Sequence, residues 1–145
     1  MNLRMSTVII GGNTVGTEVA ANLALNGKAV TLLKRTPEGP GLGMQITKTD
    51  LIKLAAEHGA KRLTGWKPVE IRSDCVVAEN AETGEQAEFP CDTVLIACGM
   101  TPRHDEAMKF LHCCPETNFF IIGDAVRSGD VRDAVFQAFE VTRSL

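Results

Sequence analysis

The chain has 145 residues and a formal net charge of −3, with a pI near 5.6. The length fits a single domain, and 44% hydrophobic with 23% charged residues is ordinary for a soluble globular domain. A slightly acidic chain has no electrostatic footprint for nucleic acid. The apolar runs are too short for a signal peptide or a membrane span. We therefore expect neither nucleic acid nor a membrane as a partner.

Cysteine usage indicates a reduced, cytoplasmic protein. The count is odd, there is no Cys-x-x-Cys pattern, and no spacing is typical of zinc. The adjacent pair Cys113 and Cys114 could be redox-active, but neighbouring thiols form a bridge only with strain. The cysteines are Cys75, Cys91, Cys98, Cys113 and Cys114.

The chain begins with a strand, a glycine turn and a helix. A β-branched run predicts a strand over Thr7–Ile10, and the following periodicity predicts a helix over Thr14–Asn26. Gly27 ends that helix at the usual left-handed position. The face expected to point inward carries Val15, Val19 and Leu23.

This turn has most of the features of a dinucleotide site. Gly11 makes the turn, Gly16 permits close packing of helix on strand, and the helix N-terminus offers unpaired N–H groups to a pyrophosphate. Asn13 replaces the middle glycine of the Gly-x-Gly-x-x-Gly fingerprint, and asparagine tolerates left-handed geometry better than most residues. The alternative is a turn that needs glycines for its geometry alone. The predicted pyrophosphate-binding residues are Gly11, Gly12, Asn13, Thr14, Val15 and Gly16.

The next elements complete a βαβ unit and extend it. Lys28–Leu33 is almost wholly apolar, as expected of a parallel strand buried on both faces. A loop rich in glycine and proline over Lys34–Gly43 precedes a helix over Ile46–His58 and a short strand over Lys61–Thr64.

The second half of the chain begins with three short extended runs separated by turns, which predict an antiparallel meander. These runs are Lys67–Arg72, Cys75–Glu79 and Gln86–Phe89. After them we expect a buried strand over Thr93–Cys98, one or two helical turns over Asp105–Leu111, a strand over Asn118–Ile122 and a helix over Asp130–Leu145. Ala134, Val135, Ala138 and Phe139 are expected to face inward on that last helix.

A Lys–Arg pair follows the second strand, where NAD-preferring sites carry an acidic residue for the ribose hydroxyls. Lys34 and Arg35 would instead attract a 2′-phosphate, and each charged hydrogen bond is worth roughly 1.5–3 kcal/mol. The residues therefore favour NADP(H) over NAD(H). The alternative is two solvated bases at a strand end. Cys98 and Gly99 end the strand after the meander, where a small residue and glycine permit close approach of a ligand, or merely form a turn.

In order, these stretches resemble the pyridine-nucleotide domain of the two-dinucleotide flavoprotein reductases. The most similar group is the NADH:flavin oxidoreductases related to old yellow enzyme, including 2,4-dienoyl-CoA reductase, 2-enoate reductase and trimethylamine dehydrogenase. Besides the glycine turn, the motifs that carry the resemblance are Val30–Leu33, Gly39–Met44, Asp92–Pro102 and Ile121–Asp124.

The resemblance implies a Rossmann-like α/β domain with a parallel sheet in the order 3-2-1-4-5, helices on both faces and a three-stranded antiparallel meander. It implies an NAD(P)-binding domain over residues 1–117. Residues 118–145 resemble the second half of a split FAD domain and would pack onto the same sheet. Glu18 matches a first-helix glutamate near the nicotinamide, and Gly99 would border the nicotinamide ribose. Gly123 and Asp124 match the segment whose aspartate contacts the ribityl or phosphate side of a flavin.

Much of such an enzyme is absent from this sequence. The resemblance implies enzymes with a (β/α)₈ barrel, FMN, an iron–sulfur cluster, and a split FAD domain that encloses the NAD(P) domain. Here there is one dinucleotide fingerprint and no cluster of cysteines. The chain thus resembles an excised or truncated piece whose partners are the missing FAD-domain half and the barrel. The apolar run Phe119–Ile122 would then pair beside Thr93–Cys98 or with a second copy in a homodimer.

These motifs and the resemblance are compatible with three functions. The first is an NAD(P)H-binding module of a flavin-dependent oxidoreductase, which passes hydride to FAD and FMN toward an enoate or enoyl substrate in the intact enzyme. Alone, it would bind nucleotide weakly, bind no FAD and catalyse nothing. The second is a nucleotide-binding or subunit-docking module without redox work of its own. The third is a complete small flavin reductase assembled as a dimer.

Overall fold

The computed structural model describes residues 5–36, 46–114 and 116–145. The chain divides into two compact units, Met1–Cys98 and Gly99–Leu145. The predicted motif Gly39–Met44 lies outside the described residues. Among those residues, no helix has both the length and the apolar character that crossing a membrane requires.

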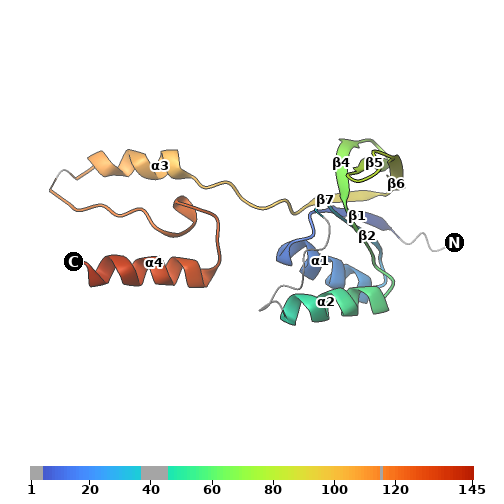
Figure 1. Ribbon diagram of the computed structural model, residues 1–145, viewed down its shortest axis with the longest axis horizontal. Helices are drawn as coiled ribbons and strands as arrows, with labels where there is room; N and C mark the ends of the chain where they lie inside the picture. The colour runs from blue at the N-terminus through green and yellow to red at the C-terminus, as the bar shows by residue number, and fades with distance from the viewer. Residues whose placement is uncertain (1–4, 37–45, 115) are drawn as a thin grey trace. The chain divides into compact units, whose positions relative to one another are not determined.

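The first unit is built on a parallel sheet in the order β3-β2-β1-β7 (Figure 1). β1 lies in the middle and pairs with β2 on one side and β7 on the other, so that Ile10 stands level with both Leu33 and Ile96. The elements of this sheet and its helices are β1 (Ser6–Ile10), α1 (Thr14–Leu25), β2 (Ala29–Lys34), α2 (Ile46–Glu57), β3 (Lys61–Thr64) and β7 (Thr93–Ile96).

The two faces of the parallel sheet have different covers. Ile9 and Leu32 pack with Ala20 of α1 on one face, and α2 lies beside α1 on that face (Figure 1). Val8 and Leu33 pack against the antiparallel sheet on the other face. Because successive side chains of a strand point to opposite sides, the unbroken apolar run of β1 serves two cores at once.

The second sheet of this unit has the antiparallel order β4-β5-β6. Its strands are β4 (Trp66–Ile71), β5 (Cys75–Asn80) and β6 (Gln86–Pro90). Val76 and Ala78 are fully buried against the parallel sheet. The rings of Trp66 and Phe89 pack edge to face, with their centroids 5.3 Å apart. The predicted meander is confirmed.

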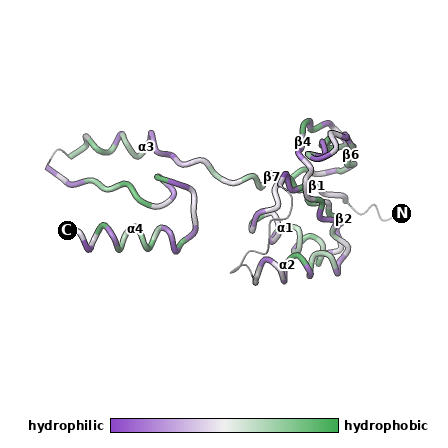
Figure 2. Tube along the Cα trace, viewed as in Figure 1, coloured by the Kyte–Doolittle hydropathy of each residue, from purple (hydrophilic) through white to green (hydrophobic). Residues whose placement is uncertain are grey.

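The second unit consists of short helices joined by irregular segments. They are α3 (His104–Met108), η1 (Lys109–His112), η2 (Gly123–Ala125) and α4 (Val131–Arg143). A capping box begins α4, in which the Asp130 carboxylate accepts the Asp133 N–H at 3.0 Å and Asp133 accepts the Asp130 N–H at 3.1 Å. Hydrophobic and hydrophilic residues alternate along α4 (Figure 2).

Two expectations about the sheet are wrong. Residues 118–122 form no strand, so the described parallel sheet has the order β3-β2-β1-β7 without a fifth strand. Helices do not cover both faces of the described sheet, because the meander covers one of them. An apolar sequence alone does not form a strand, since each strand also needs a partner edge.

Two expectations about helix faces also need correction. Val15 was expected to point inward and is 62% exposed, because α1 instead buries the small residues Gly16, Ala20 and Ala24. Val135 and Phe139 of α4 were expected inward too, yet they are 62% and 56% exposed. The other two residues expected inward, Ala134 and Ala138, are half-buried, so only the smaller residues of the apolar face are partly covered.

Candidate functional site

A cleft of about 370 Å³ opens where β1, β2 and β7 reach their carboxyl ends. This is the edge at which open parallel sheets bind their ligands. Six of the predicted site residues line it, namely Gly11, Gly12, Asn13, Lys34, Arg35 and Cys98. The fold therefore brings the glycine turn and the basic pair to the same cleft, although they come from different loops.

The glycine turn is set by close packing within the chain. Gly11 has a φ of +117°, and its N–H donates to the Leu33 carbonyl at 2.9 Å. A Cβ on Gly11 would collide with the Ala97 carbonyl oxygen, and one on Gly16 would collide with the carbonyl oxygen of Gly11. The backbone thus needs glycine at both positions whether or not a ligand binds.

Asn13 stands at the N-cap of α1 with φ −79° and ψ −175°. This is ordinary extended backbone, so the tolerance of asparagine for left-handed geometry is not used here. The Asn13 side chain is exposed and makes no capping hydrogen bond, while its carbonyl accepts the Thr17 N–H at 3.0 Å. The N–H groups of the first helical turn have no acceptor within the helix, and no acidic residue lies in that turn. The helix start is consequently open to an anion.

Lys34 is the best-placed cation of the cleft. It ends β2, is half-buried, and its stem lies so close to Gly12 that a Cβ there would come within 2.7 Å of the Lys34 Cβ. Burial and the nearby charge of Arg62 lower the pKa of Lys34, and burial and the charge of Lys34 lower the pKa of Lys48. Arg35 follows Lys34 and is exposed. Positive charge is concentrated here although the whole chain is acidic.

The other predicted residues lie outside this cleft. Thr14, Val15 and Gly16 form the first turn of α1, and Glu18 is exposed in the next turn. Cys98, by contrast, does line the cleft, and its Sγ lies 3.5 Å from the Ile10 carbonyl oxygen. Gly99, Gly123 and Asp124 belong to the second unit.

The predicted flavin-contact segment forms hydrogen bonds within its own unit. The Gly123 N–H donates to Oε1 of Gln137 at 2.7 Å, and the carboxylate of Asp124 accepts the Gly129 N–H at 3.1 Å. Gly123 is buried and Asp124 is exposed. The Asp124 carboxylate, which the resemblance would place against a flavin, thus accepts a backbone N–H of its own unit.

Sequence reasoning missed a contribution from the antiparallel sheet. Lys67 and Pro68 of β4 line the cleft beside Thr36 and Ala97. No motif marks Lys67, but the topology does: β3 ends level with the end of β2, and only Gly65 separates β3 from β4. The residues at the start of β4 therefore begin close to the end of β2, and Lys67 and Pro68 among them line the cleft.

All five cysteines are free, and Cys75 and Cys91 are buried, which raises the pKa of both thiols. In the described ranges, no group of three or more histidine, cysteine, aspartate or glutamate residues could hold a metal ion.

Comparison with known proteins agrees with the fold. The pyridine nucleotide-disulphide oxidoreductase family matches residues 2–138. NADH oxidase of Thermoanaerobacter brockii is 32% identical over 135 residues, which is 92% of this chain and 20% of that protein. Among solved structures, histamine dehydrogenase from Rhizobium sp. 4-9 matches with a TM-score of 0.82 at 18% identity, over 97% of this chain and 23% of its own. A 2-naphthoyl-CoA reductase in complex with 2-naphthoyl-CoA matches with a TM-score of 0.73 at 25% identity, over 97% of this chain and 21% of its own.

The chain spans about a fifth of the length of each of these relatives. The family match covers nearly the whole sequence, and the glycine turn heads a parallel sheet as that fold requires. The predicted superfamily is confirmed. The chain belongs to the pyridine nucleotide-disulphide oxidoreductase family, as a domain related to NAD(P)H- and flavin-dependent reductases.

Proposed function

We propose that this chain is the NAD(P)H-binding module of a larger flavin-dependent oxidoreductase. The observation that carries the proposal is the cleft in which an open helix start and a basic pair meet at the carboxyl edge of a parallel sheet. A dinucleotide has negative groups at both its pyrophosphate and, in NADP(H), its ribose phosphate. The two positive features of the cleft match these two groups.

The residues of the cleft fit a pyridine nucleotide. The pyrophosphate would lie at Gly11, Gly12 and Asn13, where the first N–H groups of α1 are open. Glu18 lies further along α1 and outside the cleft, and Cys98 lines the cleft after β7; the resemblance would put the nicotinamide end near Glu18 and Gly99. When bound, the nicotinamide supplies hydride; this chain binds and orients the nucleotide.

Lys34 and Arg35 would select the phosphorylated ribose of NADP(H) over the free hydroxyls of NAD(H). The test is the variant Lys34→Glu with Arg35→Ala, titrated with NADPH and NADH by calorimetry. We expect NADPH to bind at least about tenfold more weakly, because charged hydrogen bonds to the phosphate are lost, and NADH binding to change less than about twofold. Equal weakening of both nucleotides would contradict the assignment.

A matched control separates local contacts from net charge. Lys53 of α2 and Lys61 of β3 are exposed and do not line the cleft. The variant Lys53→Glu with Lys61→Ala alters the formal charge as much as the test variant does, since each pair exchanges one base for an acid and removes another. It should leave the preference between NADPH and NADH unchanged.

FAD does not fit this chain by itself. The sequence holds one dinucleotide fingerprint, which is taken up by the pyridine nucleotide in this proposal. We therefore assign FAD, the missing half of its domain, and the FMN and iron–sulfur barrel to the rest of the intact enzyme. The greater length of the relatives supports this assignment. We also propose that the whole enzyme acts on an enoate or enoyl substrate, and a solved relative in complex with 2-naphthoyl-CoA supports that substrate class.

A subunit-docking module is the second candidate. It is favoured by the exposed apolar residues of α4, among them Val131 and Phe136. Titration of the chain with NADPH, NADH and FAD distinguishes the functions. Saturable NADPH binding without FAD binding supports the first, and no nucleotide binding leaves the docking module. Bound flavin with turnover would instead indicate a complete small reductase.

A further inference from the structure

We propose that the antiparallel sheet forms part of the nucleotide site, with Lys67 as a third anion-binding side chain that selects a 2′-phosphorylated adenosine. Pro68 would supply the apolar wall beside the adenine. This inference rests on the proposed function, since it concerns the same cleft.

The backbone path brings Lys67 to the cleft. Lys34 stands level with Thr64 in the pairing of β2 with β3, so both strands end at the same edge. Gly65, with a φ of +78°, then turns the chain directly into β4. The second residue of β4 therefore lines the same cleft as Lys34 and Arg35.

The side chains of β4 alternate in a way that leaves the Lys67 charge available. Trp66 packs toward the core against Phe89, and the next residue, Lys67, is exposed. Glu79 stands opposite Lys67 on β5, but the Glu79 carboxylate accepts a hydrogen bond from Gln86 at 3.3 Å. Lys67 forms no ion pair with any residue in the described part of the chain.

The charged and apolar residues that line the cleft indicate the class of ligand. Lys34, Arg35 and Lys67 bring three cations to a cleft that also contains the open start of α1. A mononucleotide with a single phosphate can occupy only one of these two anion-binding features, whereas an adenosine with phosphates on both the 5′ and 2′ positions can occupy both. Pro68 is half-buried and offers an apolar ring surface without an N–H donor.

The experiment compares two probes, adenosine 2′,5′-bisphosphate and adenosine 5′-monophosphate, on the full chain. Lys67→Gln should raise the Kd of the bisphosphate by about fivefold and that of the monophosphate by less than about twofold, because an exposed ion pair is modest in energy. Lys67→Arg should retain most of the bisphosphate affinity. The control Lys53→Gln removes an exposed charge outside the cleft and should change neither constant.

Two results would overturn the inference, and they differ from failure of the proposed function. If Lys67→Gln weakens both probes equally, or no more than Lys53→Gln does, Lys67 does not read the 2′-phosphate, while nucleotide binding by the chain stands. If the unmodified chain binds neither of the probes nor NADPH or NADH, the proposed function fails, and this inference fails with it. Lys67 is exposed, so the circular dichroism spectrum of each variant should match that of the unmodified chain.

Discussion

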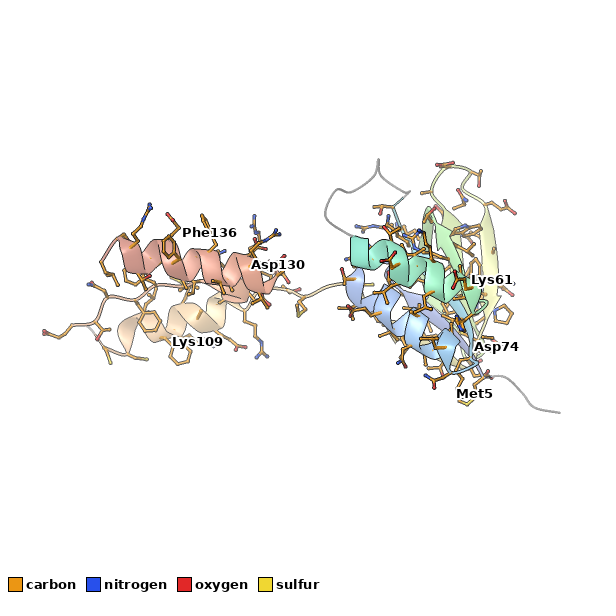
Figure 3. All side chains as sticks on the ribbon, turned by 90° about the horizontal axis from the view of Figure 1, so that it is seen from below. Met5, Lys61, Asp74, Lys109, Asp130 and Phe136 are labelled. Carbon is orange, nitrogen blue, oxygen red and sulfur yellow. The ribbon has the colours of Figure 1, made fainter. Side chains whose placement is uncertain are left out.

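The two units of this chain bury their apolar residues very differently. In Met1–Cys98, Val8 and Ile9 are 1% and 0% exposed, and separate cores lie on the two faces of the parallel sheet. In Gly99–Leu145, Gly123 is the only buried residue among those described. Phe136 projects from α4 (Figure 3) and is 61% exposed. Hydrophobic stabilisation is roughly proportional to the apolar area removed from water, so it resides almost wholly in the first unit.

The second unit is held by local hydrogen bonds instead. Its α4 begins with a reciprocal capping box at Asp130 (labelled in Figure 3), and its η2 is joined to α4 through Gly123 and Gln137. Such bonds determine local geometry but contribute only about 1 kcal/mol each to stability. An amphipathic helix arranged this way is suited to be completed by apolar surface from elsewhere, in line with the proposed place of this chain in a larger enzyme.

The largest difference between the units should appear on removing an apolar side chain from each. Leu33→Ala, at a fully buried position, should lower the free energy of unfolding by about 3 kcal/mol, and Phe136→Ala by less than about 0.5 kcal/mol. Urea unfolding followed by circular dichroism at 222 nm reports the helices of both units, and fluorescence of Trp66, the only tryptophan, reports the first unit selectively. A similar loss from both variants would mean that α4 is packed against a core.

The next effect concerns the glycine turn of the first unit. Gly11→Ala should cost about 3 kcal/mol, since the new Cβ meets the Ala97 carbonyl as well as adopting a positive φ. Gly27→Ala is the matched control, because Gly27 has a φ of +74° with open space around it. It should cost only about 1 kcal/mol, the strain of the left-handed conformation. Equal midpoints in urea for the two variants would show that packing around Gly11 is loose.

The smallest expected loss of stability comes from removing the N-cap of α4. Asp130→Ala should weaken the helix by about 1 kcal/mol and reduce the circular dichroism signal at 222 nm. The Trp66 fluorescence midpoint should stay where it is, since the cap lies in the other unit. Glu140→Gln, which removes an exposed acid from the same helix, is the control. A shift of the Trp66 midpoint would show that the two units unfold together.

The sequence predicted the elements correctly where the structure depends on residues that are close together in the chain. The β-branched run before Gly11, the glycines after it and the short meander runs each formed the predicted element, because strand and turn preferences are local. Lys34 was placed correctly at the cleft because the carboxyl ends of parallel strands share an edge.

What failed depended on partners distant in sequence. Residues 118–122 are apolar enough for a strand but have no paired edge in the described structure. Val15 follows the helical period, but the close approach of α1 to the sheet favours Gly16 and Ala20 on the buried side. Lys67 reaches the cleft through the connection between two sheets, which no local pattern reveals.

The pairing of β1 with β7 has a consequence for the order of folding. Thr7 pairs with Thr93, and Asp92 accepts hydrogen bonds from the N–H and hydroxyl of Ser6, 86 residues away, which lowers the pKa of that carboxyl. A chain emerging from the ribosome can pair β1 with β2 early, yet the other edge of β1 stays without its partner until residue 93 has been made. Closing so long a loop is slow, and an apolar strand edge left open meanwhile is a site for association between chains. Pairing with β7 therefore closes the second edge of β1.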